Sequence, residues 1–335
     1  MFQPFTGLVA APHTPFQDQD GAGGALALDV IPVQARHLAS TGVSAVFVAG
    51  ATGEGASLGA DEKRDLFETW AEAGPEHGLR VIAQVGGESV REAERLAEHA
   101  GGLDGIEALG AIAPTFQKPA TAEIVARCLA RVAGACPSKA LYYYDIPALT
   151  GLEFTAHELG RAFEEHVPEL RGIKCSRYEG WHVQDYLRAN GGKYDVLCGT
   201  DEALLSALSL GVRGAVGSTY NFAAPLFLAI MERHASGEIE GARTLQARSV
   251  DLVRALSSYG YLAASRALME HLGVPVGPPR LPIGGVGGPQ RDALLRWVDA
   301  VARGIVGLEP GLEGLLEPAP AGSAAGSPGR APVAP

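Results

Sequence analysis

The sequence predicts a (β/α)8 barrel, a TIM barrel of the α/β class, with extra helices at its C-terminal end. Short apolar segments alternate with helical segments, and β-then-α units in this number close into a barrel more naturally than into an open sheet. The apolar segments have almost no polar alternation, as expected of parallel strands covered on both faces. The predicted strands are Gly7–Ala11, Ala45–Val48, Val81–Val85, Ile106–Ala113, Leu141–Tyr144, Gly172–Cys175, Val196–Cys198 and Gly214–Val216.

Helix signals lie between these strands. The segment Asp61–Gly74 is amphipathic, with apolar residues on one side and charges elsewhere. Ser89 with Glu92, and Thr155 with Glu158, have the spacing of a capping box at the start of a helix. Further helices are predicted after the last barrel unit, at Gly237–Leu256, Tyr261–Leu272 and Pro289–Val306.

The chain is predicted to form one domain with a tail. Residues 1–308 contain the barrel and the C-terminal helices, and the Gly/Pro-rich stretch Gly273–Gly288 is expected to be a structured loop. From Glu309 the chain is rich in Pro, Ala, Gly and Ser, a composition that buries little apolar surface. We therefore predict that residues 309–335 are disordered.

Composition excludes several classes of function. The chain has 335 residues, with 27 Lys and Arg against 38 Asp and Glu, so its net charge is −11. An acidic chain without a basic cluster is a poor candidate for binding nucleic acid or an anionic membrane. No apolar segment approaches the ~20 residues that span a bilayer, and we expect no signal peptide. The four cysteines fit no zinc pattern. We therefore expect a cytoplasmic enzyme with reduced thiols.

Lys174 is the strongest candidate for chemistry, because it ends an apolar strand where barrel active sites lie. Strand side chains alternate, so Lys174 and Ser176 share one face while Ile173 and Cys175 share the other. If the first face lines the barrel, burial disfavours the ammonium and leaves a free amine that can attack a carbonyl. The alternative is a lysine that ends the strand and enters solvent.

A run of tyrosines, residues 142–144, ends the fifth predicted strand. Tyr142 and Tyr144 face one way and Tyr143 faces the other. A phenol at a strand end can relay protons when a neighbouring amine or imine lowers its pKa. The alternative is aromatic packing, which we expect for Tyr143.

A glycine-rich segment, Gly50–Gly55, follows the second predicted strand. Its glycines let the backbone approach a ligand and point N–H groups at a carboxylate, and Thr52 adds a hydroxyl. The spacing matches neither a phosphate-binding loop nor a dinucleotide fingerprint. An ordinary connecting loop is the alternative.

Polar residues also follow the last predicted strands, in Gly199–Glu202 and Gly217–Asn221. Asp201 and Glu202 could bind the hydroxyls of a polyol, or could simply begin a helix, where acidic residues suit the dipole. His13, after the first strand, could line the mouth of the barrel. The nine histidines show no metal-ligand spacing, and we predict no metal.

In combination these motifs resemble the dihydrodipicolinate synthase and N-acetylneuraminate lyase superfamily, and within it the N-acetylneuraminate lyases. The resemblance covers Phe5–Leu308. It rests on segments that occur in order and at barrel spacing: Gly50–Glu54, Tyr144–Pro147, Gly172–Lys174, Gly199–Glu202 and Gly217–Asn221.

The resemblance implies a carbon–carbon lyase that cleaves N-acetylneuraminate to N-acetylmannosamine and pyruvate, without a cofactor, as a homotetramer. It implies that Lys174 forms the imine and that Tyr144 transfers the proton. The implied substrate-binding residues are Thr52 and Gly53 for the pyruvate carboxylate, with Ser176 nearby, and Gly199, Asp201, Glu202 and Ser218 for the sugar hydroxyls.

The sequence departs from related enzymes at informative positions. Leu149 and Phe116 stand where dihydrodipicolinate synthases carry an arginine and a relay tyrosine, which favours the sialic-acid branch. Ala51 stands where most members have Ser or Thr, so a hydroxyl donor near the carboxylate and the tyrosine is missing. The open alternatives are a related 2-oxo acid aldolase or dehydratase with another acceptor, and a binding protein without catalysis.

Overall fold

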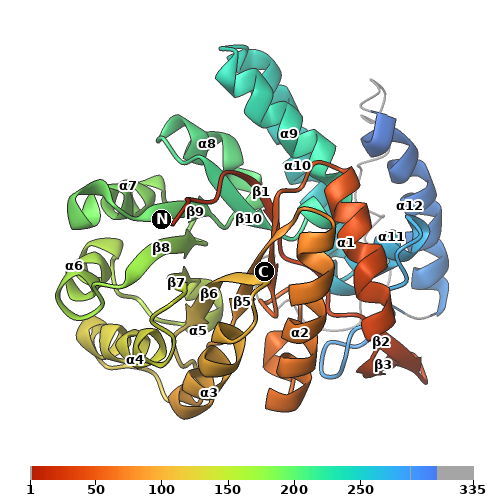
Figure 1. Cartoon of the computed structure of the whole chain (residues 1–335). Helices are drawn as coiled ribbons and strands as arrows, with labels where there is room; N and C mark the ends of the chain where they lie inside the picture. Colours follow the sequence, from red (N-terminus) through yellow and green to blue (C-terminus); the bar gives the residue numbers. More distant parts are fainter. Residues whose placement is uncertain (1, 287, 308–335) are drawn as a thin grey trace.

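The computed structural model describes residues 2–286 and 288–307, which contain a closed barrel of parallel strands surrounded by helices (Figure 1). The predicted (β/α)8 barrel is confirmed. Around the barrel the strands follow the order β1-β10-β9-β8-β7-β6-β5-β4, and β1 pairs with β4 to close it. The barrel strands are β1 (Gly7–Ala10), β4 (Ala45–Val48), β5 (Arg80–Gln84), β6 (Ile106–Ile112), β7 (Ala140–Asp145), β8 (Leu170–Cys175), β9 (Asp195–Cys198) and β10 (Gly214–Gly217).

Alternation along each strand divides the core into two parts. One buried cluster fills the barrel and includes Phe47, Tyr142 and Tyr144. The other lies between the strands and the helices and includes Tyr143 and Cys175. Because both faces of each strand are covered, most strand residues are apolar, as the sequence pattern indicates, and the exceptions include Arg80, Glu107 and Lys174.

The helices surround the barrel and start at the predicted caps. Thr155 and Glu158 form the full capping box of α6, whereas the Ser89 hydroxyl only accepts from the N–H of Glu92 at the start of α3. The helices from the N-terminus to the helix that follows β10 are η1 (Leu28–Val30), α1 (Ile31–Ser40), η2 (Gly55–Ser57), α2 (Ala60–Glu76), α3 (Val90–Gly101), α4 (Ala122–Ala135), α5 (Pro147–Thr150), α6 (Ala156–His166), α7 (Gly180–Arg188), η3 (Ala189–Gly192), η4 (Asp201–Ala203), α8 (Leu204–Ser209) and α9 (Tyr220–Ala235).

The C-terminal helices are α10 (Ile239–Ser258), α11 (Tyr261–His271) and α12 (Gly288–Gly307), close to their predicted bounds. α10 packs against α9 and α11, and α12 packs against α9 and α11 (Figure 1). A two-stranded hairpin of β2 (Phe16–Gln19) and β3 (Ala22–Leu26) was not predicted. The predicted tail, residues 309–335, lies outside the described residues.

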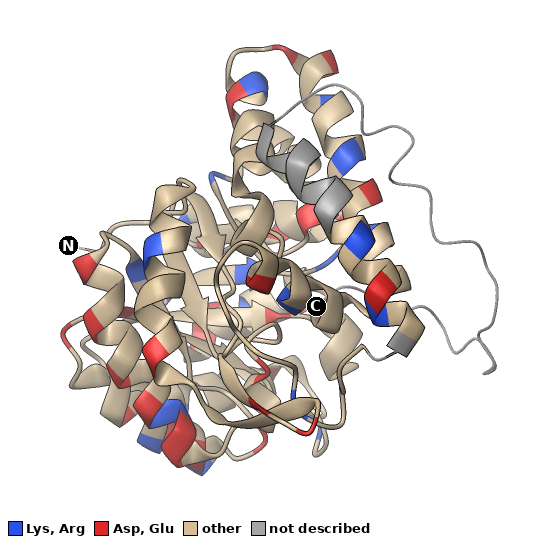
Figure 2. Cartoon of the chain, turned by 90° about the vertical axis from the view of Figure 1, so that its right-hand side faces the viewer, with Lys and Arg blue, Asp and Glu red and all other residues tan. Residues whose placement is uncertain are grey.

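Charged residues of both signs are interspersed on the helices seen in Figure 2, as expected of an ordinary solvated surface. In the part of the chain that the structure describes, no helix is both long and apolar enough to span a bilayer.

Candidate active site

Lys174 lies inside the barrel near the end of β8, with only 3% of its surface exposed. Its Nζ lies 3.8 Å from the ring centroid of Tyr144 and 4.6 Å from that of Phe47. Burial lowers the pKa of the Lys174 amine to about 7, although the Asp201 carboxylate opposes this shift. A large fraction of the Lys174 amine is therefore uncharged at neutral pH, and its role as a nucleophile stays a prediction.

Tyr144 is the residue opposite Lys174 on the neighbouring strand β7. Its ring packs edge-on against Phe47, with centroids 5.5 Å apart. Its hydroxyl makes no hydrogen bond of acceptable geometry with the described residues, although the Ser176 hydroxyl lies nearby. Burial raises the pKa of Tyr144, although the Ser176 hydroxyl opposes the shift, whereas we expected a neighbouring amine to lower it. The amine beside it is itself neutral much of the time, so the penalty of burying a phenolate dominates.

Tyr143 faces the other side of β7, as predicted. Its ring packs against Phe163 of α6, with centroids 5.0 Å apart. The expected assignment of this tyrosine to packing is confirmed.

Asp201 and Glu202 follow β9 and begin η4, which is one of the two roles that the sequence left open, and their binding of a polyol stays a prediction. Asp201 begins η4, and its Oδ2 accepts from the backbone N–H and the hydroxyl of Thr219, at 3.0 and 2.5 Å. Its Oδ1 has no partner among the described residues. Burial raises the pKa values of both acids, and for Glu202 the charge of Asp201 adds to the effect. A Cβ on Gly217 would lie 1.8 Å from Asp201 Oδ1, so this approach requires glycine.

Ser176, Gly199 and Ser218 surround the same space. The Ser176 hydroxyl donates to the carbonyl oxygen of Gly199 at 3.1 Å. The Ser218 hydroxyl lies 2.6 Å from the hydroxyl of Tyr261, on α11. Tyr261 was missed by the sequence analysis because it comes from a helix beyond the barrel, where no strand-end pattern marks it.

These residues line a pocket at the C-terminal end of the barrel. One wall is polar and contains the predicted sugar-binding residues, and the other is mainly apolar. The lining residues are Ile146, Ala148, Leu149, Ser176, Tyr178, Gly199, Thr200, Asp201, Glu202 and Ser218.

The glycine-rich turn, with Ala51, Thr52 and Gly53, follows β4 at the same end of the barrel but does not line this pocket. The Gly53 carbonyl oxygen accepts from the Thr14 hydroxyl at 2.6 Å. Glu54 has a left-handed φ of 51° and holds the turn by an ion pair with the buried Arg266 of α11. The turn is thus a tightly anchored structure, and its contact with a carboxylate stays a prediction.

His13 is fully buried, and its Nε2 lies 2.8 Å from the Ser265 hydroxyl. Burial lowers its pKa well below the usual value, and the charge of Arg266 adds to this. The expectation that His13 lines the mouth is wrong, because α11 covers it. Within residues 2–286 and 288–307, no group of three or more His, Cys, Asp or Glu side chains is arranged to hold a metal ion.

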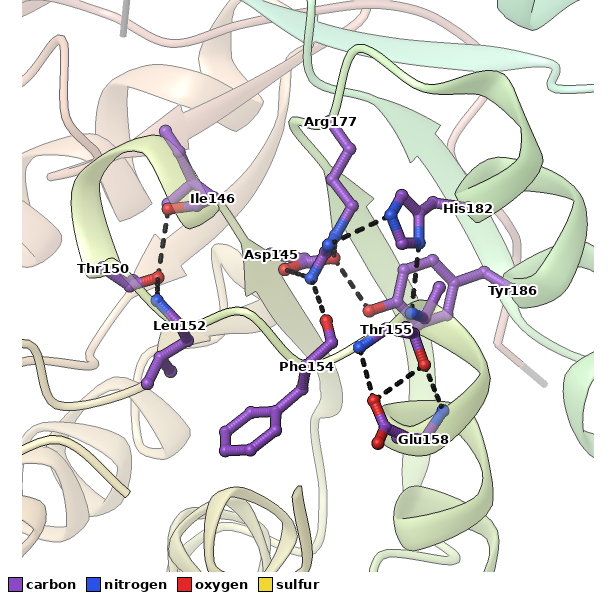
Figure 3. A network of polar contacts seen from close by, with 11 residues as sticks. Asp145, Ile146, Thr150, Leu152, Phe154, Thr155, Glu158, Arg177, His182 and Tyr186 are labelled. Carbon is purple, nitrogen blue, oxygen red and sulfur yellow. Dashed lines mark hydrogen bonds and ion pairs between the residues drawn. The ribbon is translucent and has the colours of Figure 1, made fainter. Parts of the chain in front are cut away.

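Figure 3 shows a polar network at the ends of β7 and β8, between these strands and the helices α6 and α7. Its centre is an ion pair between Asp145 and Arg177, whose side chains are only 3% and 7% exposed. The sequence analysis did not single out Arg177, since nothing in the local pattern shows what it contacts.

A buried amine and a phenol beside a polar pocket, at the C-terminal end of the strands, define a (β/α)8-barrel enzyme. The chain belongs to the dihydrodipicolinate synthetase family, whose model matches residues 4–301. It is 36% identical to the N-acetylneuraminate lyase of Homo sapiens over 281 residues, which are 83% of this chain and 86% of that protein. It is 33% identical to the N-acetylneuraminate lyase of Danio rerio over 285 residues, covering 83% and 90% of the two chains. The solved structure of Proteus mirabilis N-acetylneuraminate lyase matches with a TM-score of 0.84 and 34% identity, covering 90% of this chain and 99% of that one.

Proposed function

We propose that this protein cleaves N-acetylneuraminate to N-acetylmannosamine and pyruvate through an imine on Lys174. The observation that carries the proposal is the buried Lys174 amine, with a pKa of about 7, next to the Tyr144 ring. The adjoining pocket has the acidic wall that a polyol requires. The similarity to enzymes named N-acetylneuraminate lyase supports the choice of substrate.

The cycle starts at the amine. The neutral Nζ of Lys174 attacks the C2 ketone of the open-chain substrate, and Tyr144 donates the proton with which the oxygen leaves as water, so that a protonated imine forms beside a Tyr144 phenolate. The burial that lowers the pKa of Lys174 supplies the free amine this step needs. The imine then acts as the electron sink, so the cycle requires no cofactor.

Carbon–carbon cleavage follows. The C3–C4 bond breaks, its electron pair enters the imine to form an enamine, and Tyr144 accepts the proton of the C4 hydroxyl. The positive imine next to the phenol favours the phenolate and opposes the effect of burial on its pKa. The aldehyde leaves as N-acetylmannosamine. Protonation of the enamine at C3 and addition of water to the imine release pyruvate and restore Lys174.

The remaining predicted site residues bind the substrate. We assign Thr52 and the Gly53 backbone to the pyruvate carboxylate. Asp201, Glu202 and Ser218 are assigned to the sugar hydroxyls. Asp201 Oδ1 has no partner within the described part of the chain, which supports this assignment, because a buried acceptor without a donor can be satisfied by a substrate hydroxyl. Ser176 and Gly199 complete this wall of the pocket.

Imine trapping tests the chemistry. The protein is incubated with pyruvate and borohydride, and the adduct is located by peptide mass spectrometry. We expect the adduct on Lys174. Lys63 is an internal control, because it is also buried and burial also lowers its pKa, but it lies on α2. Labelling of Lys63 to the same extent, or an unmodified Lys174, would contradict the proposal.

A substrate panel tests the specificity. We expect pyruvate release from N-acetylneuraminate to exceed release from deoxy-sugar acids and related 2-oxo acids. Leu149 lines the pocket and supports this, since an apolar side chain cannot pair with a second substrate carboxylate. If pyruvate is trapped on Lys174 but another substrate releases pyruvate faster than N-acetylneuraminate, the protein is a different aldolase of the family. If the substrate binds but pyruvate is not trapped, the protein is a binding protein.

We also propose that the enzyme is a cytoplasmic homotetramer. Phe116 is 85% exposed, which suits burial against another subunit. The four cysteines are unpaired, as expected in a reducing compartment. A monomeric mass in sedimentation equilibrium would contradict the tetramer.

A further inference from the structure

Asp145 and Arg177 form a two-point ion pair on the outer side of the barrel wall. Arg177 Nε lies 2.5 Å from Asp145 Oδ2, and Arg177 Nη2 lies 3.1 Å from Asp145 Oδ1. The two side chains are shielded from solvent, so the contact is not a weak surface pair. Its planar fork fixes distance and angle together.

Neighbouring elements hold this pair in place (Figure 3). The Tyr186 hydroxyl on α7 donates to Asp145 Oδ2 at 2.8 Å. Arg177 Nη2 also donates to the carbonyl oxygen of Phe154, just before α6, at 2.7 Å. Each partner is therefore fixed independently, and the ion pair joins the ends of β7 and β8 to the helices that cover them.

The pair flanks the reacting residues in sequence and in space. Asp145 directly follows Tyr144, and Arg177 directly follows Ser176. Tyr144 is opposite Lys174 in the sheet, and the next pair is Asp145 and Cys175. The N–H of Ser176 donates to the carbonyl oxygen of Asp145 at 2.8 Å. Asp145 thus sits at the last rung of the β7–β8 ladder, one residue beyond Tyr144, and Arg177 lies just after β8, three residues beyond Lys174.

Stability alone does not explain a buried ion pair, since its desolvation offsets most of its attraction and apolar residues often serve as well. What it adds is a defined geometry. We propose that Asp145 and Arg177 are positioning residues that hold the ends of β7 and β8 in the arrangement in which the Lys174 amine stays packed against the Tyr144 ring. The inference rests on the proposed function for its kinetic consequence, but not for its effect on the amine.

The test compares Arg177→Lys and Asp145→Asn with a matched control. Arg177→Lys keeps the charge and loses the fork. Arg80→Lys is the control, because Arg80 makes the same kind of fork with Glu107 across β5 and β6, with Nε to Oε2 at 2.7 Å and Nη2 to Oε1 at 2.5 Å. This control pair lies at the opposite end of the barrel. All variants are assayed at temperatures where circular dichroism shows them folded.

The first measurement is the pH profile of Lys174 methylation by formaldehyde and cyanoborohydride, which needs no substrate. We expect a wild-type midpoint near pH 7, set by burial of the amine. In both variants the amine gains access to water, so the midpoint rises by about half a unit to one unit. Arg80→Lys leaves the midpoint unchanged. A role confined to stability would move the melting temperature and not this midpoint.

The second measurement is the steady-state cleavage of N-acetylneuraminate. We expect kcat to fall about tenfold in both variants while KM stays within about twofold of the wild-type value. A shift of the ends of β7 and β8 displaces the amine and the phenol more than it displaces the proposed sugar-binding residues. The double variant should be no worse than the poorer single variant if the pair acts as a unit.

Wild-type midpoints and wild-type kcat in both variants, with only a lower melting temperature, would overturn the proposal. So would equal midpoint shifts in Arg80→Lys. If the wild-type protein is methylated at Lys174 but is not trapped by pyruvate, the proposed function fails. The formaldehyde profile then still decides whether the pair positions the amine.

Discussion

The two ends of the barrel contain the same residue types in opposite states. Tyr142 and Tyr144 lie on the same face of β7, both inside the barrel. At the N-terminal end of the strands (the closed end), the Tyr142 hydroxyl donates to Asp195 Oδ2 at 2.6 Å, and the N–H of Phe5 donates to the same oxygen at 2.8 Å. At the C-terminal end of the strands (the open end), where the pocket lies, the Tyr144 hydroxyl has no partner among the described residues.

The carboxylates and cations at the two ends repeat this contrast. Asp195 at the closed end accepts hydrogen bonds from Tyr142 and from the N–H of Phe5. At the open end, Asp201 Oδ1 accepts no hydrogen bond from the described residues. Arg80 at the closed end pairs with Glu107, whereas Lys174 at the open end faces aromatic rings. Satisfied polar groups stabilise a fold, and unsatisfied ones are costly unless a ligand uses them. The difference teaches that one sheet can be built for stability at one end and for chemistry at the other.

The largest expected effect separates the two tyrosines. Tyr144→Phe should lower kcat for pyruvate release by about 10² to 10⁴, the usual range for losing a proton-transfer group. It should change stability little, because the lost hydroxyl has no partner in the described part of the chain. Tyr142→Phe should leave kcat within about twofold and destabilise the fold by about 1 to 2 kcal/mol, since Asp195 loses a donor. Steady-state kinetics and urea unfolding measure both.

If Tyr142→Phe lost as much activity as Tyr144→Phe, the division between the two ends would be wrong. Unchanged activity in Tyr144→Phe would remove the proton relay from the mechanism and leave the amine. Tyr143→Phe is a useful third variant, because that ring lies outside the barrel and contacts Phe163.

The second effect concerns the buried amine. Lys174→Met should abolish imine formation and stabilise the fold at pH 7 by up to roughly 4 kcal/mol, because the charged amine is unfavourable inside the barrel. The pKa of Lys174 is lowered from 10.5 to about 7 on folding. Between these pH values the unfolded chain holds the extra proton, so wild-type stability rises from pH 7 to 10.5 and the penalty is complete below pH 7. Urea unfolding across pH measures this slope.

Arg80→Met is the matched change at the closed end. It should destabilise the fold by about 1 to 2 kcal/mol, because Glu107 and the carbonyl oxygens of Gln3 and Pro4 lose their donor. A Lys174→Met protein that is less stable than the wild type at pH 7 would contradict the view that the amine is strained by burial.

The sequence predicted the barrel and the inward-facing residues because both depend on local patterns. A polar residue that ends an apolar strand is visible in the chain, and strand alternation then gives its face, as for Lys174 and Tyr144. The β2–β3 hairpin was missed although a signal exists. Asp20-Gly21, with φ values of 55° and 82°, is the dipeptide that tight hairpins favour.

The contacts made between distant segments could not be predicted from such patterns. Ser218 meets Tyr261 of α11, and Arg177 meets Asp145 across two strands. His13 was misplaced for the same reason, since the sequence does not show that α11 covers it. These contacts depend on how the elements pack, which spacing along the chain does not determine.

The smallest expected effect concerns Ala51, the departure from related sequences. The resemblance to related enzymes implies a hydroxyl at position 51 near the tyrosine, and the Tyr144 hydroxyl has no partner among the described residues. Ala51→Ser should raise kcat with N-acetylneuraminate a fewfold, corresponding to a neutral hydrogen bond worth on the order of 1 kcal/mol. Ala45→Ser is the control, because it adds a hydroxyl inside the barrel at the closed end of β4. That change should leave kcat unchanged and slightly destabilise the fold. If Ala51→Ser is no faster and binds pyruvate no more tightly, the proton relay uses other groups. The open end would then be complete without this hydroxyl, and the unpartnered phenol would be satisfied by the substrate itself.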